Sequence, residues 1–432
     1  TLSESSPLER AFIHGNNSAS SCRETVDVLA FHNTWLEKGV LLRDEQNTVH
    51  ALELAIAAGD LVVVEAILDA CQQLEDDEFQ DILQLGRIAI LRTALQTACR
   101  DIYDREVSLS LISFALSHGS DVNATAGMYQ DSPLIFITIE HQREELFRFL
   151  FDRGADLAAK DNQGRCSVHL FAIHGFFKSF PLEKIEELGI SFDVVDSQGR
   201  TPLHYAAKSG ALKQTQLLLE HGANANQPDF AGHRAIHHAV VSKTARIVEA
   251  VILFQERSHI NSCDHASLMT PLAIAAKDGM QDIVKLLLDS GADTFQGNKD
   301  DKLPIHHAAE HRRTAVIEEI LKNRPEQQIV ALLAARTKSK HSPLDLSIAG
   351  LRRKGDDRAA CDMLLTAGAD ATQSLVSATK NDYTWMVKYL LRYNPDLEYH
   401  DKLDAKDASS ALTAATVREN VDIVELLLKN EF

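Results

Sequence analysis

The hydrophobic positions of the chain follow two short helical patterns that alternate along it. In TPLHYAAKSG, which starts at Thr201, the residues Leu203, Ala206 and Ala207 are spaced as on one face of a helix. The hydroxyl of Thr201 can cap the start of this helix, and Gly210 can take the left-handed conformation that ends it. The pattern predicts a helix of about two turns with a narrow face of small side chains.

A second, more apolar pattern follows directly. LKQTQLLLEHG predicts a helix with Leu217, Leu218 and Leu219 on its apolar face and Gly222 as its stop. Similar stretches are ELFRFLFDRGAD, DIVKLLLDSGAD and VDIVELLLKN. The segments between the pairs, such as ANANQPDFAG, are polar and contain glycine, which predicts extended, hairpin-like loops.

The first-helix pattern recurs along the whole chain at nearly regular steps. Two helices this short cannot bury their apolar faces alone, so stacked neighbours must stabilise them. The sequence therefore predicts an all-α solenoid of about 12 helix-turn-helix units. The copies start at Ser6, His50, Thr93, Ser132, Cys166, Thr201, Arg234, Thr270, Leu303, Ser342, Gln373 and Ser410.

The sequences of the copies resemble the ankyrin repeat. The stretch at Thr201 matches the T-P-L-H-x-A signature of that family, and from Ser132 onwards the period is about 33 residues, as in the family. The resemblance is strongest from Ser132 to Gly291, continues through Gly368, and is weakest before Thr93. It implies an ankyrin-repeat solenoid with hairpin-like loops between the helix pairs.

The two ends depart from this pattern. Residues 1–92 are expected to hold divergent repeats, because the steps between the first four copies are longer than the later period. The extra sequence forms either lengthened loops or helices that cap the array. Residues 93–432 are expected to form the array itself. The end VDIVELLLKNEF leaves an apolar helix without the polar cap that solenoids need, which indicates a segment cut from a longer protein.

Composition and net charge limit the classes of partner and the cellular compartment that we expect. The net charge of −18 argues against nucleic acid as a partner. The six cysteines are scattered, and no apolar run is long enough to span a membrane, so we expect a soluble protein of a reducing, cytoplasmic compartment. The divergence of the repeats is similar to that of ankyrin effectors secreted by intracellular bacteria, which implies the host cytosol.

Motifs of enzymes are absent from the sequence, and we assign no catalytic residue, metal site or cofactor. Cys166 could be a catalytic nucleophile, but a small residue at a helix start is usually a cap or a core residue, and we interpret Cys166 in this way. The resemblance implies that His169, His204, His237 and His306 tie helix starts to neighbouring loops. His238 and His307, one residue further on, are expected to point to the concave side and contact a partner.

The resemblance also implies where a partner binds. Partners of ankyrin repeats usually lie across the concave face, on loop tips and exposed positions of the first helices. Phe230 is the sharpest candidate, although its ring could instead fold back onto the neighbouring repeat. The candidates on this surface are Gln198, Arg200, Tyr205, Lys208, Phe230 and His238.

Charge points to a second surface. Between Lys299 and Arg358 the chain has 13 Lys and Arg against 9 acidic residues, a net charge of +4, so the rest carries −22. The segment is either a solvated face or a basic patch for an acidic or phosphorylated segment of a partner protein. The candidates are Lys302, His307, His311, Arg312, Lys338, Lys340 and His341.

Two functions remain open at this point. The first is a non-enzymatic scaffold that binds a protein partner on its concave face. The alternative is a targeting or regulatory module of a larger enzyme whose catalytic domain lies outside this segment. An enzyme that uses the irregular N-terminal region is a weaker hypothesis, and the sequence gives no oligomeric state.

Overall fold

The structure is a computed structural model that forms two compact units, residues 1–167 and 168–432. It describes residues 112–113, 116–117, 120–123, 132–174, 182–254, 259–349, 358–380, 382–393 and 405–429. The expected N-terminal region of residues 1–92 and the copies at Ser6, His50 and Thr93 lie outside the described residues. The boundary between residues 92 and 93 therefore stays a prediction.

The described residues form nine pairs of consecutive helices, in agreement with the nine copies that start at Ser132 or later. The pairs are α7 (Leu134–Glu140) and α8 (Glu144–Phe151); α9 (Ser167–His174) and α10 (Leu182–Glu187); α11 (Pro202–Ser209) and α12 (Leu212–Glu220); α13 (Ala235–Val241) and α14 (Ala245–Phe254); α15 (Pro271–Asp278) and α16 (Gln281–Asp289); α17 (Pro304–Glu310) and α18 (Thr314–Leu321); α20 (Pro343–Ala349) and α21 (Ala359–Thr366); α22 (Thr372–Lys380) and α23 (Thr384–Tyr393); and α25 (Ala405–Val417) and α26 (Val421–Lys429).

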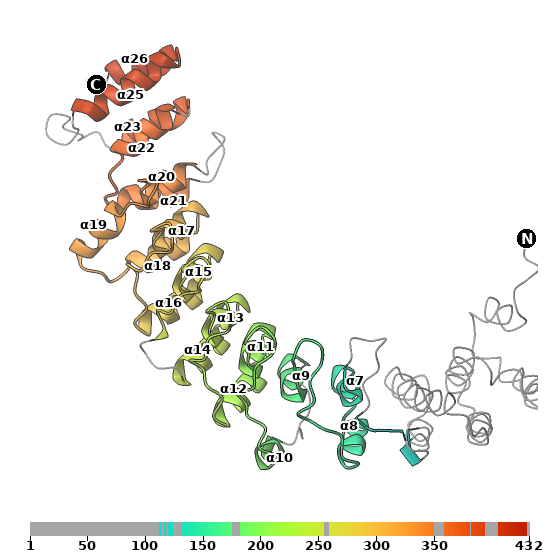
Figure 1. Ribbon diagram of the computed structural model, residues 1–432. Coiled ribbons are helices and arrows are strands. Elements are labelled where there is room, and N and C mark those ends of the chain that lie inside the picture. The colour runs from blue at the N-terminus through green and yellow to red at the C-terminus, as the bar shows by residue number, and fades with distance from the viewer. Residues whose placement is uncertain are drawn as a thin grey trace, which may run out of the picture. The chain divides into compact units, whose positions relative to one another are not determined.

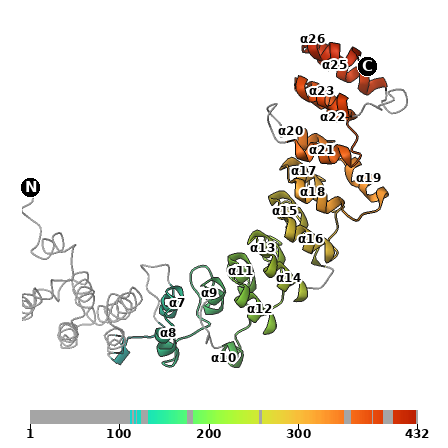
Figure 2. The same cartoon turned by 180° about the vertical axis from the view of Figure 1, so that it is seen from behind.

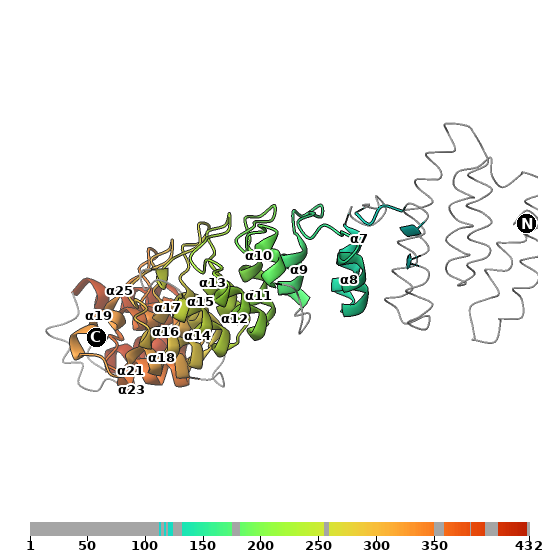
Figure 3. The same cartoon turned by 90° about the horizontal axis from the view of Figure 1, so that it is seen from below.

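In the second unit the first helices of successive pairs pack side by side. Helices α11, α13, α15, α17 and α20 each contact the next, and so do α12, α14, α16, α18 and α21. Figures 1 and 2 show the two rows on opposite sides of the stack, with the first helices on the inner side of the bend of this unit. Figure 3 shows that the connecting loops project together from one edge. We call the row of first helices and these loops the first-helix face.

Local chemistry explains where the helices begin and end. Thr270 caps α15, because its Oγ1 accepts a hydrogen bond from the backbone N–H of Ala273 at 3.1 Å. Gly210 and Gly279 end α11 and α15 with φ of 80° and 83°, the left-handed conformation. Leu203 and Leu218, from the two helices of one pair, are fully buried. The predicted helix pairs and their stacking are confirmed.

One helix was not predicted. Helix α19 (Glu326–Ala334) follows α18 and contacts α20, with Leu332 and Leu333 buried. Its insertion explains why the step from Leu303 to Ser342 is longer than the usual period. None of the described helices is long and apolar enough to cross a membrane.

Candidate partner-binding surface at the loop tips

The described loop tips that precede α11, α13, α15, α17 and α20 are each closed around one side chain at the start of the loop. The backbone N–H of Asp196 donates to the carbonyl of Arg200 at 3.0 Å, and Oδ1 of Asp196 accepts from the N–H groups of Gln198 and Arg200 at 2.7 and 2.9 Å. Asp229 and Asn298 close their tips in the same way. Sequence analysis did not single out these residues, although their recurrence at the same place in successive repeats was a usable signal.

The tips are joined into one continuous edge. A single backbone hydrogen bond links each tip to the one before it, with lengths between 2.8 and 3.0 Å. These bonds fix the spacing between repeats and confirm the expected hairpin-like loops. In each bond a backbone N–H of the later tip donates to a backbone carbonyl of the earlier one: Phe230 to Gln198, His265 to Ala231, Lys299 to Ser267, and Lys338 to Asp300.

The four histidines of the repeat signature have the expected structural role. The backbone N–H of Thr201 donates to Nδ1 of His204 at 3.0 Å, so Nε2 carries the proton and donates to the carbonyl of His233 at 3.1 Å. His237 and His306 make the same pair of bonds, and His169 reaches the carbonyl of Arg200 at 3.1 Å. Burial lowers the pKa of His204 and His306 to about 4 each, so these rings are neutral at pH 7.

On the first candidate surface, two side chains are occupied by their own loop. The hydroxyl of Tyr205 donates to Oδ2 of Asp196 at 2.6 Å, and the guanidinium of Arg200 lies 5.6 Å from the centre of the Tyr205 ring. Both residues are half-buried, whereas Gln198 and Lys208 are exposed.

Phe230 packs on the neighbouring repeat and yet stays exposed. Its ring lies against the preceding tip, since a Cβ added at Gly199 would be 2.5 Å from Cδ1 of Phe230. The side chain nevertheless keeps the residue 71% exposed. Its free face can therefore contact a partner while the other face packs on Gly199.

His238 and His307 do not project from the first-helix face as expected. His307 is 6% exposed, and its Nε2 lies 3.4 Å from Nδ2 of Asn298. Nε2 of His238 faces Oδ2 of Asp229 at 3.4 Å, and its side chain is 14% exposed. Burial is the main cause that lowers the pKa of both rings. Both histidines therefore face the residue that starts their own loop, Asp229 or Asn298.

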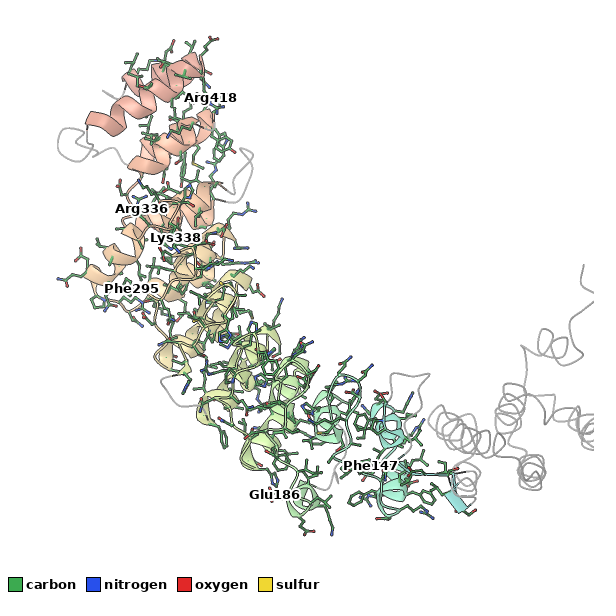
Figure 4. All side chains as sticks on the ribbon, viewed as in Figure 1. Phe147, Glu186, Phe295, Arg336, Lys338 and Arg418 are labelled. Atoms are coloured by element: carbon green, nitrogen blue, oxygen red, sulfur yellow. The ribbon has the colours of Figure 1, made fainter. Side chains whose placement is uncertain are left out.

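Part of the second candidate surface is neutralised by ion pairs. Nζ of Lys302 lies 2.8 Å from Oε2 of Glu310, and Nη1 of Arg336 lies 3.1 Å from Oδ2 of Asp345. Lys338 is exposed and its Nζ donates to the carbonyl of Lys299. Figure 4 shows Arg336 and Lys338 between α19 and α20.

Two other basic side chains of this surface are not neutralised by ion pairs among the described residues. Arg312 and Lys340 are exposed, and within the part of the chain that the structure describes neither forms an ion pair. His341 is also exposed at the tip before α20.

His311 and Arg312 lie in the turn beyond the end of α17, because this helix stops at Glu310. The surface therefore has a tip end with Lys338, Lys340 and His341 and a turn end with His311 and Arg312. The tip end also carries the exposed acids Asp300 and Asp301. The run Arg352, Arg353 and Lys354 lies outside the described residues.

These stacked helix pairs with joined loop tips define a repeat solenoid. Residues 168–264 and 236–331 match the family described as ankyrin repeats (3 copies). The matched part of the chain, residues 168–331, consists of ankyrin repeats. Ankyrin repeats indicate a protein–protein interaction module.

Relatives share only part of their length with this chain. It is 27% identical over 302 residues to transient receptor potential cation channel subfamily A member 1 of Homo sapiens, which covers 62% of this chain and 26% of that protein. It is 28% identical over 156 residues to the B-cell lymphoma 3 protein homolog of Mus musculus, covering 35% of this chain and 34% of that protein. The solved ankyrin repeat domain of Bcl-3 aligns with 52% of this chain and 97% of that chain, at 21% identity and a TM-score of 0.43.

Proposed function

We propose that this chain is a non-enzymatic scaffold that binds an acidic or phosphorylated segment of a partner protein on its first-helix face. The proposed site runs from the tip end with Lys338, Lys340 and His341 along this face to Arg312, in the turn just beyond α17. It lies within an unusually basic stretch of a chain whose net charge is −18.

One observation supports this proposal most. Arg312 and Lys340 are exposed and carry no ion pair among the described residues, although acidic residues outnumber basic ones in the chain. A free guanidinium can hold a carboxylate or phosphate through two parallel hydrogen bonds. Nucleic acid is disfavoured, since a net charge of −22 outside the basic stretch repels a long polyanion.

Two further proposals come from the sequence. A role as a bacterial effector in the host cytosol rests on the divergence of the repeats. The alternative function is a targeting or regulatory module of a larger enzyme whose catalytic domain lies outside this segment. The chain spans only 26% and 34% of the length of the two relatives named above.

The basic surface can be tested by partner capture. The tagged chain and the variant Arg312→Glu/Lys338→Glu/Lys340→Glu are incubated with a eukaryotic lysate, and bound proteins are compared by quantitative mass spectrometry. The control variant reverses three exposed lysines of second helices or their ends, Lys213→Glu/Lys285→Glu/Lys322→Glu, and so changes the net charge equally. We expect proteins that the control retains and the first variant loses. Equal capture by both variants would contradict the proposed site.

A further inference from the structure

Three side chains of one repeat converge at the tip that precedes α13. Asp229 starts the loop, His233 ends it, and His238 lies one turn into the helix. One ligand atom from each, a carboxylate oxygen and two imidazole nitrogens, lies within 4.8 Å of the other two. Among the residues that the structure describes, no other three His, Cys, Asp or Glu side chains come together in this way.

Neighbouring repeats show what these positions do elsewhere. In the repeat of Asp196, Arg200 and Tyr205 occupy the positions of His233 and His238. The Tyr205 hydroxyl donates directly to the Asp196 carboxylate at 2.6 Å. Around Asp161, an Arg165 nitrogen lies 2.7 Å from the carboxylate. In both repeats the side chains make short, direct contacts to the acid.

The distances around Asp229 are different. Nε2 of His238 lies 3.4 Å from Oδ2 of Asp229, and Nδ1 of His233 lies 3.6 Å from Oδ1. Charge-assisted hydrogen bonds are about 2.7–2.9 Å long. Ligand atoms around a tetrahedral zinc ion with bonds of about 2.0–2.1 Å are roughly 3.3 Å apart. The 3.4 Å between Nε2 of His238 and Oδ2 of Asp229 is longer than such a hydrogen bond and close to the spacing of two ligands of one ion. All three ligand atoms lie within 4.8 Å of one another, near enough to converge on one ion.

The surroundings orient these ligands. Oδ1 of Asp229 accepts from the backbone N–H groups of Ala231 and His233 at 2.9 and 2.8 Å, which fixes the carboxylate and turns Oδ2 towards His238. The ring of His204 packs edge-on against that of His238, with centroids 5.3 Å apart. The side chain of His233 is 34% exposed, so it has room to adjust and leaves a path from solvent.

We propose that Asp229, His233 and His238 form a binding site for a divalent transition-metal ion of the zinc type, with a fourth position open to water or to a ligand from a partner. Two imidazoles and one carboxylate are ligands that Zn²⁺, Ni²⁺ and Cu²⁺ accept, whereas Mg²⁺ and Ca²⁺ prefer oxygen alone. The site is independent of the basic surface proposed above.

The preceding repeat supplies a matched variant. His233→Arg/His238→Tyr gives this loop the side chains that Arg200 and Tyr205 provide around Asp196, so the fold should be kept. The control His341→Arg makes the same change at the corresponding tip position before α20, where the loop starts with Thr337. A second variant, Asp229→Asn, keeps an oxygen that can accept the two backbone hydrogen bonds.

Zn²⁺ binding to the full chain is measured by calorimetry, and Co²⁺ binding by the visible absorption of four-coordinate cobalt. We expect the wild type and His341→Arg to bind one equivalent more than His233→Arg/His238→Tyr, whose affinity at this site should fall more than about 100-fold because it loses two of three ligands. Asp229→Asn should bind more weakly, and it decides the question if the double variant does not fold. Equal stoichiometry and affinity in the wild type and a folded variant would overturn the proposal.

Discussion

The ring of Phe230 occupies the space where a side chain at Gly199 would lie. A Cβ at Gly199 would be 2.5 Å from Cδ1 of Phe230, and Gly199 has a φ of 75°. Only glycine fits both conditions without strain. Two neighbouring loop tips are therefore packed together, while Phe230 still presents its outer face to solvent.

Gly199→Ala should destabilise the fold through both effects. The left-handed backbone alone costs about 1–2 kcal/mol for a residue with a Cβ, and the contact with Phe230 adds to it. In a Phe230→Ala background the contact is removed, so the same substitution should cost less. Urea unfolding of the four proteins of this double-mutant cycle measures the difference. An equal cost of Gly199→Ala in both backgrounds would show that the ring does not press on this position.

Leu218→Ala should lower the free energy of unfolding by about 2–5 kcal/mol, the usual range for truncating a core leucine. Leu218 is fully buried in α12, whereas its neighbour Leu217 is half-buried. Leu217→Ala is therefore the matched control and should cost clearly less. Chemical denaturation followed by circular dichroism compares the two, and equal losses would contradict the assigned register of α12.

The buried His306 should make the fold less stable in mild acid. Burial lowers its pKa from 6.5 to about 4. Above pH 6.5 the ring is neutral in both states, and between pH 6.5 and 4 the unfolded chain binds the proton more readily. Stability should thus fall as the pH falls, by about 2 kcal/mol from pH 7.5 to 5 for this group.

His306→Asn tests this contribution. The amide oxygen can still accept from the backbone N–H of Leu303, which donates to Nδ1 of His306 at 3.1 Å in the wild type. The variant should be less stable at pH 7.5 but should lose less stability on going to pH 5. A loss as steep as that of the wild type would place the acid sensitivity elsewhere.

Sequence reasoning succeeded where the cause was local or periodic. Thr201 could be assigned as a helix cap because a cap lies directly before its helix, whereas the role of His204 came from the resemblance to the ankyrin signature. The helix pairs followed from the apolar positions and from the nearly constant spacing of the copies.

It failed where the answer depends on contacts across a loop. His307 was expected to reach outwards, but Asn298, nine residues earlier, lies beside it and the ring is buried. The cluster of Asp229, His233 and His238 was missed because histidines were compared between repeats, where ligands do not converge. The spacing of these three residues within one repeat was the signal to follow.

Binding strength at the basic surface tests the central claim most directly. The affinity of a captured partner is measured by calorimetry at low and high salt for the wild type, for Arg312→Glu/Lys338→Glu/Lys340→Glu and for the second-helix control. We predict that wild-type binding weakens as salt rises, that the first variant loses at least about 10-fold with an unchanged Tm, and that the control keeps its affinity. Wild-type affinity in the first variant would contradict the account and move the site to the surface of Gln198, Lys208 and Phe230.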